Sequence, residues 1–222
     1  MNINYIYTSL EKESKVNYFF LNESNLKSFN THSFYNKIYD NSFLNYNNHS
    51  FNSINSKTNC YFFLFGVFSK VFSNFARLLK FKSRNDIMAK VYHYKKSSFS
   101  RVFFKSVLSD FSVCNFDALI DVEFDVCDTD SGVVCKSLLL DNSSNINMFP
   151  NLSIKNNDVK CFHGATVGFL EEEVLFYLMS RGFSKDECVH FLVHAFLNDI
   201  IYDSSLDFFN VFDFLFEKYY KF

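Results

Sequence analysis

The sequence predicts a mainly β protein in which short strands stack on one another, followed by a C-terminal helical region. Between positions 120 and 126, apolar residues alternate with acidic ones, a period of two that indicates a half-buried strand. Two more apolar runs, 133–140 and 152–154, follow at a spacing of roughly 10–15 residues with polar turns between them. No helical pattern separates these runs, which argues against an alternating βαβ fold.

Charge and composition divide the chain into three predicted parts. Residues 1–60 hold 14 Asn and nine Ser, and we expect a divergent or loosely ordered segment there, with short strands near Phe34 and Phe51. Residues 61–170 form the predicted β core, and residues 171–222 form the predicted helical domain. The first part of the core, 61–105, carries ten Lys and Arg against a single acid, whereas residues 106–222 are acidic.

The helical prediction rests on its end signals. Glu171–Glu173 place negative charge where a helix begins, Gly182 is a natural stop, and Ser184 with Glu187 forms a capping box for a second helix. A third helix is predicted over 206–219. The predicted apolar face of the second helix consists of Cys188, Phe191, Leu192, Ala195 and Phe196.

Composition excludes several functions. The chain has 32 Phe, 13 Tyr and 25 Asn but five Gly, one Pro and no Trp, which indicates A/T-rich coding DNA and predicts that much of the Phe fills generic apolar positions. No Gly-rich phosphate loop is present, so we expect no ATP or NAD binding by that route. A net charge of −2 excludes a global polycation.

The cysteines and the apolar stretches indicate a cytoplasmic protein. Six Cys occur without a CxxC pair, and the first ten residues carry no apolar block of the kind found in signal peptides. The longest uncharged apolar-rich stretch, 58–69, is shorter than the ~20 residues that a membrane helix needs.

The densest motif is Asp-Val-Lys-Cys-Phe-His-Gly-Ala-Thr-Val-Gly, residues 158–168. Two of the five glycines, Gly164 and Gly168, fall here, and we expect them to adopt positive φ or to allow close backbone approach. A strand would place Cys161 and His163 on one face, about 6.6 Å apart, where both can reach one metal or sulfur species with help from another chain. The alternative is a buried thiol and a hydrogen-bonded structural imidazole.

This motif, followed by Leu-Phe-Tyr-Leu-Met-Ser-Arg-Gly at 175–182, closely resembles the C-terminal part of SufD-like members of the SufB/SufD family of iron–sulfur cluster assembly proteins. Gly164 favours the SufD branch, because the SufB branch usually has an acid there. The resemblance covers 91–200, is plausible over 61–90 and is not recognisable over 1–60. Its fainter upstream marks are His93, Ser100, Arg101, Phe104, Lys105, Val107, Leu108, Ser112, Phe116, Leu138, Leu139, Leu140, Pro150, Leu152 and Ile154.

The resemblance implies a right-handed parallel β-helix core followed by a C-terminal α-helical domain. It implies a non-enzymatic scaffold subunit that pairs with SufB and docks the separate ATPase SufC through 171–203. His163 matches the family histidine near the SufB junction, which implies a metal ligand for a nascent iron–sulfur cluster shared with the partner. Cys161 matches a nearby family cysteine and is a second candidate cofactor-binding residue. No nucleotide is expected on this chain.

Four departures from the family pattern qualify this interpretation. Ser106 and Ala118 stand where the family has Gly, so two tight turns are expected to change. Phe162 replaces a small polar residue and is expected to alter access to His163. The N-terminal half is also much shorter than in the family, which predicts fewer β-helix coils.

Other functions remain open at this point. The chain is alternatively a purely structural docking remnant of the SufB–SufC complex, or a nucleic-acid-binding protein through the basic stretch 61–105. His190 and His194 have the i, i+4 spacing of a zinc pair, but Phe191 stands where the metalloprotease motif needs Glu, so they are interpreted as helix-surface histidines. The three acids of the alternating strand, Asp121, Glu123 and Asp125, are interpreted as a solvated face.

Overall fold

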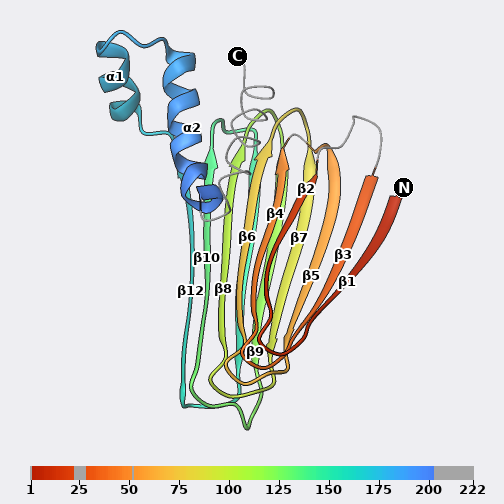
Figure 1. Ribbon diagram of the computed structural model, residues 1–222. Helices are drawn as coiled ribbons and strands as arrows, with labels where there is room; N and C mark the ends of the chain where they lie inside the picture. Colours follow the sequence, from red (N-terminus) through yellow and green to blue (C-terminus); the bar gives the residue numbers. More distant parts are fainter. Residues whose placement is uncertain (1, 23–28, 52, 203–222) are drawn as a thin grey trace.

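The computed structural model describes residues 2–22, 29–51 and 53–202. The chain winds as a parallel β-helix of two six-stranded sheets, with two helices at the C-terminal end of the described residues (Figure 1). The elements are β1 (Asn2–Leu10), β2 (Lys15–Asn22), β3 (Phe29–Ile38), β4 (Phe43–Phe51), β5 (Asn55–Leu64), β6 (Lys70–Leu79), β7 (Arg84–His93), β8 (Phe99–Leu108), β9 (Val113–Val122), β10 (Thr129–Leu139), β11 (Asn145–Ile154), β12 (Val159–Phe169), α1 (Glu172–Ser180) and α2 (Lys185–Tyr202).

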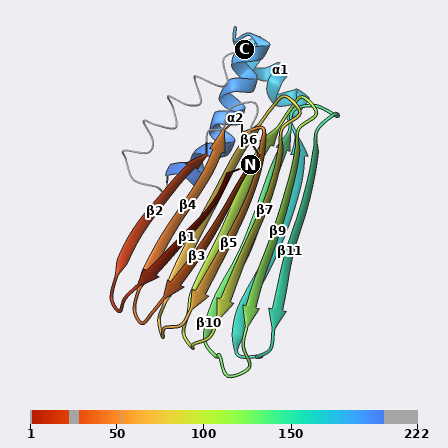
Figure 2. The same ribbon diagram turned by 90° about the vertical axis from the view of Figure 1, so that its right-hand side faces the viewer.

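Odd-numbered strands form one sheet and even-numbered strands form the other. Their orders are β1-β3-β5-β7-β9-β11 and β12-β10-β8-β6-β4-β2, so each coil adds one strand to each sheet (Figure 2). All pairs are parallel, and one coil stacks in register on the next. The predicted mainly β fold, the β-helix core and the C-terminal helices are therefore confirmed.

In-register stacking explains the abundance of aromatic residues. The interior is filled by fully buried rings, such as Phe62 and Phe104, from alternate positions of the strands. On the outer face of the odd-numbered sheet, Tyr7 stacks on Tyr35 with ring centroids 5.0 Å apart, and Tyr35 stacks on Tyr61 at 4.9 Å. Successive coils thus place like residues on top of one another, which favours ring stacking.

The prediction for residues 1–60 differs from the structure. The described residues in this range form β1 to β4 and the first half of β5, and they continue the same solenoid. Asn was interpreted as a sign of weak order, but in a β-helix its amides pair from coil to coil. Asn74 Nδ2, for example, donates to Asn47 Oδ1 at 2.9 Å. A ladder of paired amides orders the strands even where the sequence shows no alternation of apolar and polar residues.

Turns use few glycines. Nine non-glycine residues among those described have positive φ, including the exposed Phe81 and Phe111 in the equivalent turns of two successive coils. Gly66 is different, since an added Cβ there would lie 2.0 Å from the carbonyl carbon of Tyr39. The expectation that Ser106 and Ala118 alter tight turns is wrong, because both are fully buried inside strands β8 and β9.

Two further local predictions need correction. Phe124 is 73% exposed, because β9 ends at Val122 and the period-two pattern runs on into a turn. In α2, Phe191 and Ala195 of the predicted apolar face are exposed. The buried residues of this helix are Cys188, Val193, Leu197, Ile200 and Ile201.

The ends of the helices agree with the sequence. Ser184 and Glu187 form the capping box, with Ser184 N donating to Glu187 Oε2 at 2.8 Å and Glu187 N donating to Ser184 Oγ at 3.3 Å. Gly182 has φ +100° after α1. The predicted helix 206–219 lies outside the described residues. No helix in the described ranges has the length and apolar character needed to cross a membrane.

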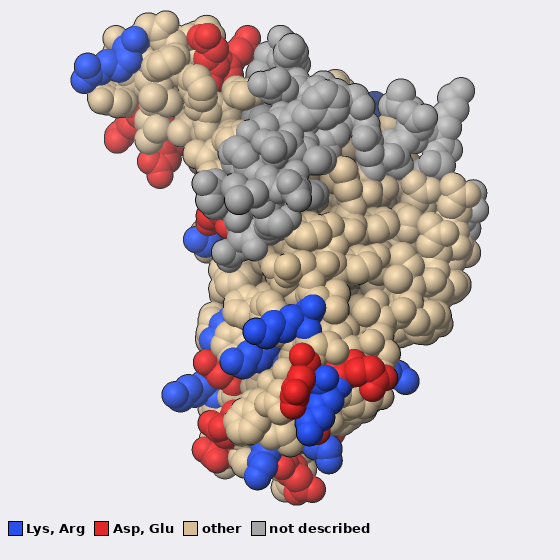
Figure 3. Space-filling model, viewed as in Figure 1, with Lys and Arg blue, Asp and Glu red and all other residues tan. Residues whose placement is uncertain are grey.

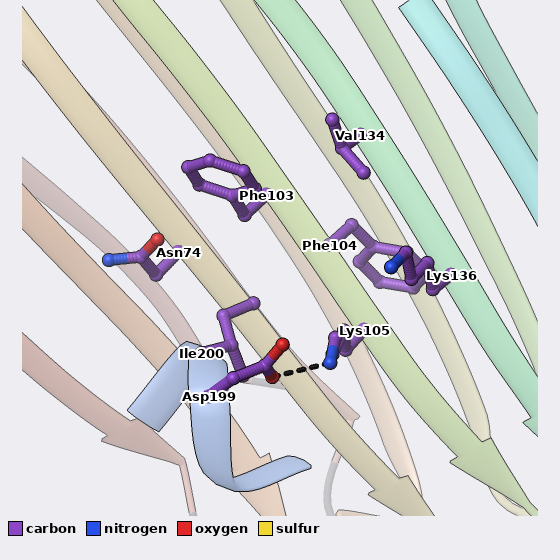
Figure 4. Close-up of a pocket in the computed structure, with 8 residues that line it drawn as sticks. All are labelled: Asn74, Phe103, Phe104, Lys105, Val134, Lys136, Asp199 and Ile200. Atoms are coloured by element: carbon purple, nitrogen blue, oxygen red, sulfur yellow. Dashed lines mark hydrogen bonds and ion pairs between the residues drawn. The ribbon is translucent and has the colours of Figure 1, made fainter. Parts of the chain in front are cut away.

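Helix α2 packs on the outer face of the even-numbered sheet. Its apolar side meets Ala76, Leu78 and Val107. Lys105 of β8 donates to the carbonyl oxygen of Phe196 at 2.7 Å and forms an ion pair with Asp199, beside a cavity of about 150 Å³ (Figure 4). A cation near the C-terminal end of a helix also interacts favourably with the helix dipole.

Candidate functional site

The candidate site lies at the C-terminal end of the solenoid, on the outermost strands β11 and β12 (Figures 1 and 2). β12 pairs with β10 on one edge, and no described strand lies on its other edge. Its residues His163 and Cys161 stand opposite Val133 and Ser131, both buried residues of the inner face. The two predicted ligands therefore share the inner face of β12, as the strand pattern predicts.

His163 reaches across the solenoid from one sheet to the other. Its side-chain Nδ1 lies 2.6 Å from the carbonyl oxygen of Pro150 in β11. A carbonyl oxygen can only accept, so Nδ1 carries the proton and donates it. In the neutral ring Nε2 then has the lone pair, which is the arrangement that fixes the ligating nitrogen of metal-bound histidines. Because His163 is exposed, this nitrogen is accessible to a ligand.

Cys161 has a different environment. It is half-buried and packs against the interior core of the solenoid. Burial raises the pKa of its thiol, as does the carboxylate of Asp130, while Arg101 and the backbone of Ser131 act in the opposite direction. Since the thiolate is the form that binds metals and attacks sulfur, a raised pKa makes Cys161 the weaker candidate ligand.

The two glycines of the motif do not adopt positive φ, which was one of their two predicted roles. Gly182 is the only glycine with positive φ among the described residues, and β12 continues through Gly164 and Gly168 to Phe169. An added Cβ at either position of β12 would meet nothing within 4 Å. These glycines instead leave the outer face of an edge strand bare, which is where another backbone can approach closely.

Phe162 does not stand between solvent and His163. Its ring lies on the opposite face of β12 and covers Gly132 of β10, where an added Cβ would come within 2.4 Å of the ring. Arg101 packs beside the same ring, and its guanidinium carbon lies 5.0 Å from the centroid of Phe162. Its Nη2 also forms an ion pair with Asp130 Oδ1 at 2.8 Å. The sequence analysis did not predict this packing of Phe162 on Gly132. Gly132 carried the available signal, as one of only five glycines in the chain.

The structure does not bring together a metal site or an acid/base site from the other candidate residues in the described ranges. No three His, Cys, Asp or Glu side chains cluster around a possible metal position in the described ranges. His190 and His194 are half-buried on α2. Asp121 and Glu123 lie on the outer face and form ion pairs with Lys155 at 3.6 and 3.0 Å, as expected of a solvated strand face.

The basic residues of 61–105 do not form one surface. Arg77 is 1% exposed and faces the interior, and Lys105 lies beneath α2. Arg84 and Arg101 pair with acids on the outer faces, and the charged residues visible in Figure 3 alternate in sign. These four residues therefore do not share one basic stripe of the kind that marks a nucleic-acid footprint.

The fold and this site define a class of protein: a parallel β-helix in which the last described strand exposes an imidazole at the open end of the solenoid. A sequence model described as "SUF system FeS cluster assembly, SufBD core domain" matches residues 2–196. The chain therefore belongs to the SufB/SufD family of iron–sulfur cluster assembly proteins and is SufD-like. The match also extends the family resemblance to the N-terminal segment in which it was not recognisable from sequence.

Individual relatives agree with this assignment. The iron–sulfur cluster assembly protein SufD of Escherichia coli (strain K12) is 34% identical over 108 residues, which are 49% of this chain and 26% of that protein. A SufBD family protein, ycf24 of Galdieria sulphuraria, is 29% identical over 123 residues, 55% of this chain and 56% of that protein. The chloroplastic protein ABCI7 of Arabidopsis thaliana is 37% identical over 86 residues, covering 39% and 18%. The matched part of the chain thus spans less than two thirds of each of these relatives.

Proposed function

We propose that this chain is a non-catalytic SufD-like subunit that helps to assemble a nascent iron–sulfur cluster, the cargo of the complex, at its junction with a SufB-like partner. The observation that carries the proposal is the exposed Nε2 of His163, whose tautomer is set by the 2.6 Å contact between Nδ1 and Pro150. A thiolate from the partner and this imidazole together suit iron–sulfur species. ATP hydrolysis belongs to a separate SufC-like chain, and the complex works in the cytoplasm.

The surface for the SufB-like partner is the open end formed by β11 and β12. Its inner face is incompletely covered, since Ile146, Met148 and Leu152 pack against the core but are only partly buried. Gly164 leaves the outer face of β12 open next to His163. Pairing at this edge would cover apolar surface and bring partner side chains beside the imidazole.

The surface for the SufC-like ATPase is the hairpin of α1 and α2. No residue of α1 is buried, and the hairpin exposes a group of large apolar side chains. These are Phe176 at 74%, Tyr177 at 56%, Met179 at 45%, Phe183 at 40% and Phe191 at 49% exposure. An apolar patch of this kind typically marks a protein interface, and apolar anchors supply most of the binding energy.

His163→Ala tests the cluster proposal in the co-expressed complex. The variant should retain the SufB-like and SufC-like proteins on co-purification, because it removes one exposed side chain, and should lose cluster accumulation, read by visible absorbance and iron content. Cys161→Ser should lose less, since the half-buried thiol is the weaker ligand. A His163→Ala complex that loads clusters normally would overturn the cluster role and leave this chain as a docking part.

Phe176→Ser tests the ATPase surface. We expect it to abolish recovery of the SufC-like protein while the SufB-like protein still co-purifies. Phe124→Ser is the matched control, because Phe124 is equally exposed at 73% but lies on a turn of the solenoid. Equal recovery of the SufC-like protein with both variants would exclude the hairpin as its docking surface.

A further inference from the structure

One layer of the solenoid interior is polar. Its inner-face row consists of residues that stand opposite one another on five successive strands of the even-numbered sheet: Asn22, Ser50, Arg77, Ser106 and Ser137. All five are buried. Ser106 Oγ and Ser137 Oγ share a hydrogen bond at 2.7 Å, and Asn22 Nδ2 donates to Ser53 Oγ at 3.3 Å. Because buried polar groups need hydrogen-bond partners, Ser50 and Arg77 are the members of this row still to be accounted for.

The hydrogen bonds of Arg77 leave one edge of its guanidinium group unused. The group has five N–H donors. Nη1 donates to Asn48 O at 2.7 Å and to Ala76 O at 2.9 Å, and Nη2 donates to Asn48 Oδ1 at 2.9 Å. Since Asn48 accepts from both Nη1 and Nη2, it occupies the edge between those two nitrogens. The edge between Nε and Nη2 remains, and Nε has no hydrogen-bond partner in the part of the chain that the structure describes. Such a fork is the part of an arginine that binds anions.

No anionic group of the described residues balances the charge of Arg77. A guanidinium stays protonated in proteins. The ion pairs of the described residues do not include Arg77. The nearby groups able to become anions are Cys60, Cys114 and Tyr46. Burial raises the pKa of both thiols to about 12 and raises the pKa of the Tyr46 phenol well above its usual value, so all three are neutral at physiological pH.

A buried charge without a counter-charge is far more costly than a buried neutral group. The surrounding field is positive, since the charge of Arg77 adds to burial in lowering the pKa of His32 and of His49. The interior at this layer therefore favours the entry of a negative ion. Arg77 is only 1% exposed, so the ion has to be small, and a single charge suffices to balance a single guanidinium.

We propose that this layer binds one small monovalent anion, with chloride as the simplest case, on the edge of Arg77 formed by Nε and Nη2. Ser50 is the second donor, because its buried Oγ also has no partner among the described residues and it stands beside Arg77 on the adjacent strand. A water molecule would satisfy the hydrogen bonds of both groups but would leave the charge unbalanced, whereas an anion does both. The site lies in the middle coils, so it is independent of the proposed cluster function at β11 and β12.

Stability in chloride tests the site. Urea unfolding of the purified chain is measured at equal ionic strength in sodium chloride and in sodium gluconate, whose anion is too bulky to reach a group that is 1% exposed. A ligand that binds only the folded state raises the folding equilibrium constant by 1 + [L]/Kd. For a Kd of about 10 mM, about 100 mM chloride should raise this constant about tenfold. Equal unfolding curves in the two salts would overturn the proposal.

Three variants locate the effect. Arg77→Met removes the cation, so the difference between the two salts should disappear. Ser50→Ala removes only a hydroxyl without a partner, so stability in gluconate should hardly change while the chloride affinity falls about threefold or more. Arg101→Met is the matched control and should keep the full difference, because Arg101 already pairs with Asp130 at 2.8 Å. A chloride effect of wild-type size in both Arg77→Met and Ser50→Ala, or its equal loss in Arg101→Met, would overturn the assignment to this layer.

Diffraction gives an independent check that needs no variant. Bromide has the charge of chloride and nearly its size, and it has an anomalous signal that water lacks. In crystals of the wild-type chain grown with sodium bromide, we expect an anomalous peak within hydrogen-bond reach of Arg77 Nε and Nη2 and of Ser50 Oγ. Density at this position without an anomalous peak would identify a water molecule and overturn the proposal.

Discussion

His163 Nδ1 donates a hydrogen bond to the carbonyl oxygen of Pro150, 2.6 Å away, and this contact joins the last strand of each sheet. It orients the imidazole at the open end and fixes which nitrogen is free. Pro150 has no backbone N–H, so β11 tolerates it only as an edge strand, and its carbonyl remains available to the histidine. The same pair of residues therefore marks the end of the solenoid and presents the candidate ligand.

His163→Asn separates the two roles of this side chain. The asparagine amide can donate to Pro150 O as Nδ1 does, but it supplies no nitrogen lone pair in place of Nε2. If Nε2 is the ligand, His163→Asn should lose cluster accumulation as completely as His163→Ala while keeping the stability of the wild type. The measurements are iron content of the complex and urea unfolding. Normal cluster loading in His163→Asn would limit the histidine to an orienting role.

Gly132→Ala should destabilise the fold by about 1–2 kcal/mol, because the new methyl group would enter the space of the Phe162 ring. Phe162 is 47% exposed, so its ring can be removed without opening the core. In a Phe162→Ala background, Gly132→Ala should therefore cost almost nothing. A double-mutant cycle by urea unfolding measures this coupling. Gly164→Ala, with nothing within 4 Å of the added Cβ, is the control and should be neutral or slightly stabilising.

Arg77 is a buried cation that holds two coils together. Its Nη1 donates to Asn48 O at 2.7 Å and its Nη2 donates to Asn48 Oδ1 at 2.9 Å. Arg77→Ala should cost about 3 kcal/mol, since it leaves a cavity and unsatisfied acceptors. Arg77→Met keeps most of the volume and should cost less. Equal losses of unfolding free energy would show that the hydrogen bonds, and not the packing, account for the effect.

The parts of the fold that the sequence predicted were those with local physical signatures. The capping box of Ser184 and Glu187 is a contact between near neighbours, and it is visible in any sequence that contains it. Residues 1–60 were misjudged because their order comes from pairing of like residues a whole coil apart, as between Asn47 and Asn74. Composition alone does not show such a repeat when the coil length varies.

The features of the candidate site that follow from local spacing were predicted, and those that depend on contacts between sheets or coils were not. The period of the strand placed Cys161 and His163 on one face, and the structure agrees. The hydrogen bond between His163 and Pro150 joins different sheets, and the packing of Phe162 on Gly132 joins different coils. Neither contact follows from spacing along the chain. Gly164 and Gly168 have the extended backbone of β12, so of their two predicted roles positive φ is wrong, and close backbone approach stays a prediction.

Acid should weaken the fold through its buried histidines. His93 is fully buried, with Nδ1 2.7 Å from Ser98 Oγ and Nε2 3.0 Å from Ser100 Oγ. Burial lowers the pKa of His93 to about 3, and burial together with Arg77 lowers the pKa of His49 to about 3. In the unfolded chain both return to about 6.5. The unfolded state therefore binds more protons than the folded state between these values.

The stability from these groups is complete above about pH 6.5 and is lost as the pH falls toward about 3. Each of the two histidines should lower the free energy of unfolding by up to about 1.4 kcal/mol per pH unit in that window. Urea unfolding between about pH 7 and about pH 5 measures the slope before most carboxylates titrate. His93→Gln removes one of the protons that the unfolded state binds in this window. It should therefore reduce the slope by up to about 1.4 kcal/mol per pH unit, whatever its effect on stability at neutral pH. A slope unchanged by His93→Gln would show that the imidazole of His93 is not kept neutral by its burial in the fold.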